Sequence, residues 1–442
     1  MFEKKVVPGK PEEVIEEKRL GELYELKSKL HADLIENIDL EALLKFDSET
    51  ARLELTKVIW ELINNTNRPL SIAEKKMAVE EVVNETFGLG PLEQLLQDKT
   101  VDDILVNDYR TVYVERRGKL EKLSLRFKDN THLSHIINRI VARVGRRIDE
   151  GSPMVDARLP DGSRVNAIIP PLSLGGPILC IRKFKDVPLN SKDLVRMGCV
   201  SEEMLYLIQL AVRSRINILI AGGTGSGKTT LLNILSAFIP HNERIVTIED
   251  AAELQLQQPH VLRLETRPAN MENKGSVTSR DLVRNSLRMR PDRIVVGEVR
   301  GEETLDMLQA MNTGHDGSLT TVHSNSPRDA LARVETMVLM HNSNMNQVAL
   351  LRQIASAIEI VIFVRRYSDG VRRMESIQEI TGLEGNVIAM QEIAGFIQKG
   401  VSADGKCLGS FELHPVRPKF FERAQALGVL SNTDLNGKGQ KY

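Results

Sequence analysis

One segment of this 442-residue chain restricts its fold more than any other. Residues 218–235 read ILIAGGTGSGKTTLLNIL: a short apolar run, a glycine-rich turn, Lys-Thr-Thr, and then apolar residues at helical spacing. The apolar run is typical of a buried strand, and the segment after the turn is typical of a helix that packs against it. The segment therefore predicts a strand–loop–helix unit. Strands that alternate with helices, as they do through residue 390, predict a mostly parallel α/β sheet.

The turn of this unit matches the pattern G-x-x-x-x-G-K-[ST]. Its glycines allow successive backbone N–H groups to point inward around a phosphate. Lys228 adds a positive charge, and the Thr229 hydroxyl can bind Mg²⁺. A glycine turn without a ligand is the alternative, but the flanking strand and helix favour phosphate binding. We expect these residues to bind a nucleotide: Gly222, Gly223, Thr224, Gly225, Ser226, Gly227, Lys228, Thr229 and Thr230.

Two further apolar runs end in acidic residues. DRIVVGEVRG places Glu298 at the end of a predicted strand, and RIVTIEDAAEL places Glu249 and Asp250 at the end of another. Ligands of open α/β sheets bind at the carboxyl ends of the strands. There, Glu298 can orient and deprotonate an attacking water, and the second group of carboxylates suits Mg²⁺ and its waters. For Asp250 and Glu253, the alternative is that they only decorate a helix N-terminus.

The residue before Glu298 departs from the generic P-loop pattern. Gly297 occupies the position at which many such proteins place an aspartate that supports Mg²⁺. We therefore expect the support for the metal to come from another strand, with Glu249 as the main candidate.

Two histidines flank a run of small polar residues in MNTGHDGSLTTVHSNSP, residues 311–327. A single histidine is usually structural. A pair around a Gly/Ser/Thr segment near the end of a predicted strand suggests groups that sense a terminal phosphate, because no metal-ligand set surrounds them. We expect His315 and His323 to take part in catalysis.

Residues 1 to about 85 are highly charged, and their apolar residues follow helical spacing. Two sets of residues indicate two helices: Leu23, Leu26, Leu30 and Leu34, and then Leu53, Val58, Ile59 and Leu62. Ser71 can cap a third helix, with Glu74 in the capping-box position. No cluster of catalytic residue types occurs here, so we expect a helical bundle or arm.

The character of the sequence changes at GLGPLEQLL, residues 88–96. Hairpin signals at Arg117-Gly118 and turns at Asp161-Gly162 alternate with one helical segment, which predicts a smaller α/β domain. This domain should end at a linker near Asp186-Val187-Pro188. The chain then divides into a helical extension (1–75), an α/β N-terminal domain (76–187), the sheet domain with the phosphate loop (188–395), and a loop-rich C-terminal subdomain and tail (396–442).

Composition argues against several classes of protein. Lys and Arg total 59 against 60 for Asp and Glu, so nothing indicates a protein held to nucleic acid by bulk charge. Three cysteines without a CxxC suit a reducing cytosol. No apolar run approaches the roughly 18 residues that span a bilayer, and the first residues lack the apolar region of a signal peptide. We expect membrane association only through partner proteins.

With four segments in this order, the chain resembles the type II/type IV secretion ATPase superfamily. The family names for them are Walker A (GGTGSGKTT), Asp box (IVTIEDAAEL), Walker B (RIVVGEVR) and His box (GHDGSLTTVHSNSP). Glycine before the Walker B glutamate is the form that this family uses. The match covers about residues 75–395 and is similar to the CpaF-like branch, which serves tight-adherence (Tad) pili. Two features agree with that branch: the lack of a four-cysteine zinc insertion and of an AIRxxGG-like segment.

The resemblance implies a RecA-like P-loop motor domain, preceded by a smaller α/β domain and an N-terminal helical bundle. It also implies a cytoplasmic homo-hexamer whose two domains are joined by a flexible linker, with ATP and Mg²⁺ between them. Carried onto this sequence, Lys228 and Thr229 bind phosphates and Mg²⁺, Glu298 is the catalytic base, and Glu249 assists at the metal and water.

Three arginines of the N-terminal domain match family arginines that reach the nucleotide: Arg158, Arg164 and Arg182, in DARLPDGSR and IRKF. Guanidinium groups on a moving domain would neutralise the γ-phosphate only when the cleft closes, which couples chemistry to domain rotation. The alternative is that they are solvated surface arginines, since this region is rich in arginine.

Three functions are compatible with a phosphate loop of this kind. The first is an ATP-driven motor for assembly, or also retraction, of Tad or type IV-like pili, or for secretion, working through inner-membrane platform proteins. The second is a RecA-like nucleic-acid translocase, disfavoured by the even charge balance and a 4% aromatic content. The third is a small-molecule kinase, disfavoured because two acidic strand ends and a His box suit hydrolysis.

Overall fold

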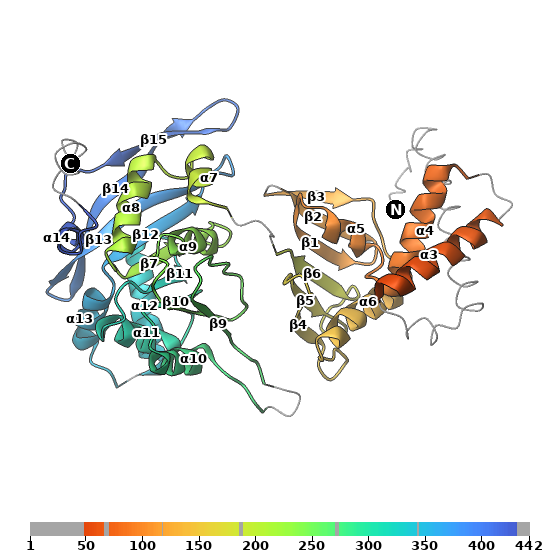
Figure 1. Ribbon diagram of the computed structural model, residues 1–442, viewed down its shortest axis with the longest axis horizontal. Coiled ribbons are helices and arrows are strands. Elements are labelled where there is room, and N and C mark those ends of the chain that lie inside the picture. The colour runs from red at the N-terminus through yellow and green to blue at the C-terminus, as the bar shows by residue number, and fades with distance from the viewer. Residues whose placement is uncertain are drawn as a thin grey trace, which may run out of the picture. The chain divides into compact units, whose positions relative to one another are not determined.

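The structure is a computed structural model that describes residues 48–65, 70–116, 118–184, 189–269, 274–342 and 344–430. The chain divides into two compact units, residues 1–184 and 185–442, and each is described by itself (Figure 1). The first predicted helix, with its four leucines, lies outside the described residues, as do the linker at residues 186–188 and the polar tail from residue 431.

Two helices begin the described part of the first unit, α3 (Ser48–Asn64) and α4 (Ile72–Phe87). Ser71 is the N-cap of α4: its hydroxyl accepts a hydrogen bond from the Glu74 N–H, and the Glu74 carboxylate accepts one from the Ser71 N–H at 2.8 Å. The predicted capping box is confirmed. The two helices share a small apolar core of Leu55, Ile59, Ile63, Ala78, Val79, Val82 and Val83.

A six-stranded antiparallel sheet forms the rest of the first unit, in the strand order β3-β2-β1-β6-β5-β4. Its elements are α5 (Leu92–Gln97), β1 (Val101–Asp108), β2 (Thr111–Arg116), β3 (Lys119–Leu123), α6 (Asn130–Arg143), β4 (Met154–Arg158), β5 (Arg164–Ile168) and β6 (Ile178–Arg182). The predicted hairpin at Gly118 is confirmed as β2–β3, with Gly118 at φ 78°. Helix α6 contributes Leu133, Ile136 and Ile137 to the core of this unit.

A nine-stranded sheet organises the second unit, in the order β15-β14-β13-β12-β7-β11-β10-β8-β9. Its strands are β7 (Ile218–Gly222), β8 (Ile245–Glu249), β9 (Val261–Glu265), β10 (Arg293–Val296), β11 (Leu319–His323), β12 (Ile360–Arg366), β13 (Arg372–Glu384), β14 (Val387–Val401) and β15 (Cys407–Leu413). Neighbours from β12 to β9 pair in parallel, whereas β12 to β15 pair antiparallel. The predicted, mostly parallel sheet is confirmed.

Helices cover both faces of this sheet. They are α7 (Ser191–Arg196), α8 (Glu202–Arg213), α9 (Lys228–Ser236), α10 (Ser279–Ser286), α11 (Glu303–Asn312), α12 (Pro327–His341), α13 (Gln347–Ala357) and α14 (Phe420–Ala426). Successive residues of a strand face opposite sides. Ile218 and Ile220 of β7 therefore pack in one core with α8, α9 and α14, and Leu219 and Ala221 pack in the other with α10 to α13.

The C-terminal part differs from the expectation of loops after residue 395. Strand β14 runs through that position, pairs with both β13 and β15, and extends the sheet. Gly395 and Gly400 weaken the strand signal in the sequence, because glycine is uncommon inside strands. The fold requires the first of them: a Cβ at Gly395 would lie 2.9 Å from the Glu375 carbonyl oxygen on β13.

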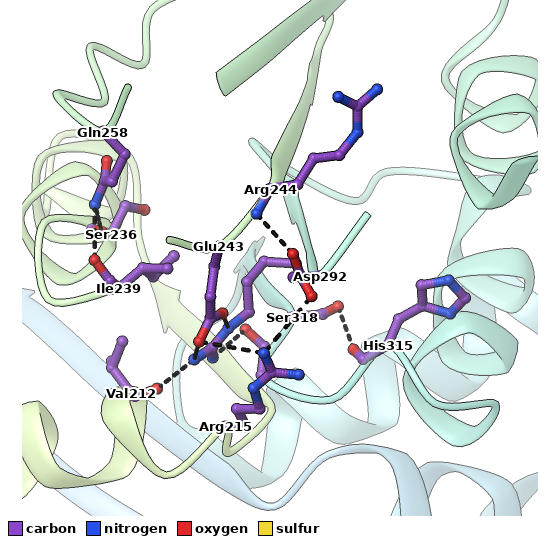
Figure 2. Close-up of polar contacts among 12 residues, drawn as sticks. Val212, Arg215, Ser236, Ile239, Glu243, Arg244, Gln258, Asp292, His315 and Ser318 are labelled. Carbon is purple, nitrogen blue, oxygen red and sulfur yellow. Dashed lines mark hydrogen bonds and ion pairs between the residues drawn. The ribbon is translucent and has the colours of Figure 1, made fainter. Parts of the chain in front are cut away.

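A buried charge network joins the amino ends of the central strands (Figure 2). Arg293, the first residue of β10, is fully buried, and its guanidinium contacts Glu243 at 2.5 Å. It also donates to the carbonyl oxygens of Val212 at 2.9 Å and Gly317 at 3.1 Å. Gly317 is required here, because a Cβ would lie 1.7 Å from Arg293 Nη1. These contacts hold together the amino ends of the parallel strands, at the edge of the sheet opposite their carboxyl ends.

Candidate nucleotide site

The glycine-rich segment joins β7 to α9, as predicted. Gly222 ends the strand, and a Cβ there would lie 2.3 Å from the Val364 carbonyl oxygen of β12 and 2.7 Å from Ser226 Oγ. Gly227 precedes the helix in the left-handed conformation, at φ 94°. Both glycines are therefore dictated by the backbone: the first by close packing and the second by its torsion angle. The loop between them leads into the N-terminus of α9, where a phosphate would meet free backbone N–H groups.

Lys228 is the first residue of α9, and its side chain is folded against the loop. The residue is 7% exposed, and its Nζ donates to the Gly223 carbonyl oxygen at 3.1 Å. The same nitrogen lies 3.3 Å from His323 Nδ1. Burial lowers the pKa of Lys228, and the charge of Glu298 acts in the opposite direction. The half-buried Thr229 follows it on the helix.

Glu298 lies between a histidine and an arginine just beyond β10. Its Oε1 is 3.1 Å from His323 Nε2, and its Oε2 is 2.5 Å from Arg300 Nη2 and 2.9 Å from Arg300 Nε. Burial lowers the pKa of His323, although the charge of Glu298 acts in the opposite direction. The lowered pKa favours the neutral ring at neutral pH. A neutral ring can accept from Lys228 at Nδ1 and donate to Glu298 from Nε2. The structure thus brings Lys228, His323 and Glu298 together.

Gly297 and Glu249 explain how the metal can be supported without an aspartate at residue 297. Strands β8 and β10 pair in parallel, and the Gly297 N–H donates to the Ile248 carbonyl oxygen at 2.8 Å, next to Glu249. A Cβ at Gly297 would lie 3.0 Å from Glu249 Cγ, tighter than an ordinary contact. The glycine therefore leaves the space that the glutamate side chain needs.

Glu249 offers one free oxygen at this edge. The residue is 5% exposed, and its Oε1 accepts hydrogen bonds from the N–H groups of Glu253 at 2.9 Å and Leu254 at 3.0 Å. Its buried Oε2 has no hydrogen-bond partner among the described residues. Burial raises the pKa of Glu249, and the two backbone N–H groups oppose that rise. A buried carboxylate oxygen without a partner fits Mg²⁺ or a water bound to it.

The protein donors at this edge are few. Across the ranges that the structure describes, no three His, Cys, Asp or Glu side chains gather into a metal-binding group. Mg²⁺ is commonly held by one or two protein oxygens together with substrate phosphates and waters. Glu249 and Thr229 fit that donor set.

Asp250 and Glu253, the two other acidic residues after β8, do not lie at the start of a helix. Residues 250–260 are irregular, so the alternative of a decorated helix N-terminus is wrong for Asp250 and Glu253. Asp250 instead accepts a hydrogen bond from Ser279 Oγ at 3.1 Å and lies 3.2 Å from Arg300 Nη1. Asp250 is therefore the second carboxylate that holds the Arg300 guanidinium.

Two arginines at this edge were missed by sequence reasoning. Arg300 bridges Glu298 and Asp250, and its position two residues after the glutamate was the available signal. Arg372 on β13 donates from Nε to the Gly225 carbonyl oxygen at 2.9 Å. No motif marks it, because it approaches the loop from a strand 147 residues away in sequence.

His315 lies at the other edge of the sheet. It precedes β11, whereas His323 ends that strand beside Gly222 of β7. Figure 2 shows the His315 ring pointing away from Ser318, whose hydroxyl donates to the His315 carbonyl oxygen at 2.8 Å. The structure does not bring His315 to the loop, because His315 lies before the first residue of β11, Leu319, whereas His323 is the last residue of that strand.

The three arginines of the first unit lie in one row. Arg158 on β4 is the cross-strand partner of Arg164 on β5, and Arg164 is the partner of Arg182 on β6. Arg182 also contacts Asp103 of β1 at 3.2 Å. The antiparallel register therefore gathers at one end of three strands residues that stand up to 24 positions apart in the sequence, counted from 158 to 182.

Comparison with known proteins gives consistent matches. Residues 85–403 match the model of a family described as type II/IV secretion system protein. A Mycobacterium tuberculosis protein named for conjugal transfer is 37% identical over 330 residues, covering 73% of this chain and 93% of that protein. The type IV secretion system protein VirB11 of Brucella abortus is 31% identical over 339 residues, covering 70% and 93%.

Two solved structures are also similar to parts of this chain. The VirB11 ATPase of the Brucella suis type IV secretion system, in complex with sulphate, is 27% identical with a TM-score of 0.37, covering 67% of this chain and 97% of that one. The ATPase DotB of Legionella pneumophila is 22% identical with a TM-score of 0.47, covering 63% and 77%. None of the helices in the described part of this chain has both the length and the apolar character needed to cross a membrane.

Proposed function

Because the chain belongs to the type II/IV secretion system protein family, we propose that it hydrolyses ATP and uses the energy to assemble a pilus of the tight-adherence type. One observation supports hydrolysis above all: a continuous set of contacts at the carboxyl edge of the sheet. Lys228 Nζ lies 3.3 Å from His323, and His323 lies 3.1 Å from Glu298. A phosphate-binding lysine and a carboxylate are thus separated by a single imidazole ring.

Each of these groups has a separate task in the proposed reaction. The loop N–H groups and Lys228 bind the phosphates, and Thr229 and Glu249 hold Mg²⁺, the latter directly or through water. Bound Mg²⁺ supplies neutralisation of phosphate charge. Glu298 takes the proton from the attacking water, and Arg300 keeps its carboxylate in one orientation. His323 contacts both the lysine and the base, so it is placed to respond to the terminal phosphate.

The first unit completes the site in this proposal. Arg158, Arg164 and Arg182 reach the γ-phosphate when the two units close around ATP. Their cross-strand register supports joint action, since adjacent strands hold the three guanidinium groups at one end of the sheet. Hydrolysis then removes the charge that holds them and lets the units separate, which converts chemistry into rotation.

The proposed assembly is a cytoplasmic homo-hexamer at the inner face of the cytoplasmic membrane. It reaches the membrane through pilus platform proteins and binds no nucleic acid directly. The CpaF-like branch is supported by the matching Walker, Asp-box and His-box segments and by the absence of any CxxC in the sequence. Assembly, retraction or both fit the same site.

An ATPase measurement without any acceptor substrate tests the proposal. Phosphate release that DNA leaves unchanged, and that phospholipid or membranes with platform proteins increase, is the expected result. A small-molecule kinase would stay inactive until an acceptor was supplied, and a nucleic-acid translocase would be stimulated by DNA. Either outcome would overturn the proposal.

A further inference from the structure

Four arginines gather at the end of one hairpin beside the phosphate loop. Strand β12 pairs in parallel with β7, and Val364 is the partner of Gly222. Beyond this pair, the β12–β13 hairpin carries two cross-strand arginine pairs, Arg365 with Arg373 and Arg366 with Arg372. The sheet therefore places this hairpin directly next to the first residue of the loop.

One of these arginines anchors the hairpin. Arg373 makes two contacts with Asp369, at 2.8 and 3.0 Å, and lies over the rings of Tyr367 and Phe396 at 5.2 and 5.0 Å. The hydrogen bond from Arg373 lowers the pKa of Asp369 to about 2. Asp369 also accepts hydrogen bonds from the N–H groups of Val371 and Cys407, at 3.0 and 3.1 Å. These bonds hold the turn rigidly.

The neighbouring arginine faces the loop, because successive residues of a strand point to opposite sides. Arg372 donates from Nε to the Gly225 carbonyl oxygen at 2.9 Å. Its Cδ would lie 3.3 Å from a Cβ at Gly227, so the side chain runs beside the loop from Gly227 to Gly225. Its two terminal amino groups have no hydrogen-bond or ion-pair partner among the described residues, although Arg365 is paired with Glu375 at 2.7 Å.

We propose that Arg372 binds the phosphates of the nucleotide, as an arginine supplied within the same subunit by the β12–β13 hairpin. The inference rests on the proposed nucleotide site. A guanidinium with two free amino groups beside a phosphate loop matches the fork geometry with which arginine binds phosphate oxygens. Its Nε bond to Gly225 and the anchored Arg373 hold it in place before the ligand arrives, so little side-chain freedom is lost on binding.

The experiment titrates the full-length protein with a fluorescently labelled ATP in the presence of Mg²⁺. The fluorescence change reports binding, and the titration is repeated at several KCl concentrations. The variants are Arg372→Gln and Arg372→Lys, with Arg365→Gln as the matched control from the same hairpin. Arg372→Gln should weaken ATP binding by about tenfold or more, as expected for loss of a hydrogen bond to a charged group. The loss of one ion pair should also make the salt dependence of its affinity less steep. Arg372→Lys should recover part of both effects, and Arg365→Gln should behave as wild type.

Unchanged affinity in Arg372→Gln would overturn the inference. A weaker affinity with an unchanged salt dependence, or no recovery in Arg372→Lys, would also overturn it, since the side chain would then only brace the Gly225 carbonyl. Melting temperatures without nucleotide check that each variant folds. Wild-type protein that does not bind ATP, or Lys228→Ala that binds it normally, would instead refute the proposed nucleotide site itself.

Discussion

Glu298 and Arg300 are joined by two contacts on one carboxylate oxygen, 2.5 Å to Nη2 and 2.9 Å to Nε. The other oxygen faces His323. Arg300 is itself held by Asp250 at 3.2 Å. Rotation of the Glu298 carboxylate would therefore break its ion pair with an arginine that cannot simply follow it. In the proposed reaction, Arg300 therefore orients the carboxylate, and the oxygen on the histidine side would accept the proton.

Arg300→Gln should therefore reduce kcat for ATP hydrolysis by about tenfold to a hundredfold while KM changes little, because the ground-state contacts with the phosphates remain. Arg300→Lys keeps the charge but not the paired contact, so its kcat should lie between those of the wild type and Arg300→Gln. Steady-state kinetics measure both constants. A raised KM with unchanged kcat would assign Arg300 to substrate binding instead.

Glu298→Gln should bind ATP as wild type and lose turnover by at least about a hundredfold, since the amide keeps the shape but cannot accept the proton. Lys228→Ala should lose ATP binding itself. Equilibrium binding and phosphate release, measured on the same preparations, distinguish the two defects. Normal hydrolysis in Glu298→Gln would require a different base.

Gly297→Ala tests whether Glu249 supports the metal. The new Cβ would lie 3.0 Å from Glu249 Cγ and must displace that side chain. We expect the Mg²⁺ concentration for half-maximal hydrolysis to rise several-fold, with little change in binding of ATP to the loop. Gly301→Ala is the control, because its nearest contact would be 3.4 Å, to the end of the Glu303 side chain. An equal Mg²⁺ requirement in the two variants would count against Glu249.

The pKa of Glu249 predicts a pH-dependent change in stability. Burial raises this pKa above the ordinary value of 4.5, so the ionised carboxylate destabilises the folded state. The cost is absent below pH 4.5 and grows to its full size once the pH exceeds the raised value. Without nucleotide, Glu249→Gln should therefore raise the melting temperature at pH 8 but not at pH 4. Glu384→Gln, at an exposed position, is the control and should show no such difference.

The sequence motifs predicted the strand-end residues well, because each motif contains its own strand and the residue that follows it. Lys228, Glu249, Glu298 and His323 all follow or end buried parallel strands, and such ends share one edge. His315 was grouped with His323 by proximity in sequence, but the two histidines lie at opposite ends of β11, one before its first residue and the other at its last.

Arg372 could not be found in this way. The position of Arg372 beside the loop depends on the register of the β12–β13 hairpin and on the pairing of β12 with β7. No local sequence pattern predicts either of them. The same holds for β14: its glycines weaken the local strand signal, and its pairing with β13 and β15 depends on the tertiary structure.

Arg164→Gln tests the contribution of the first unit to the reaction. Arg164 is the middle residue of the row, with Arg158 and Arg182 as its two cross-strand partners. If the row neutralises the γ-phosphate only in the closed state, ATP binding should weaken little, because the loop of the second unit remains intact. Turnover should fall by at least about a hundredfold, as for other arginines that act on transferring phosphoryl groups. Arg110→Gln, at an exposed turn of the same unit, should retain both properties. Since the single-turnover rate isolates the chemical step, it is the measurement to make, and a wild-type rate in Arg164→Gln would remove the first unit from the catalytic site.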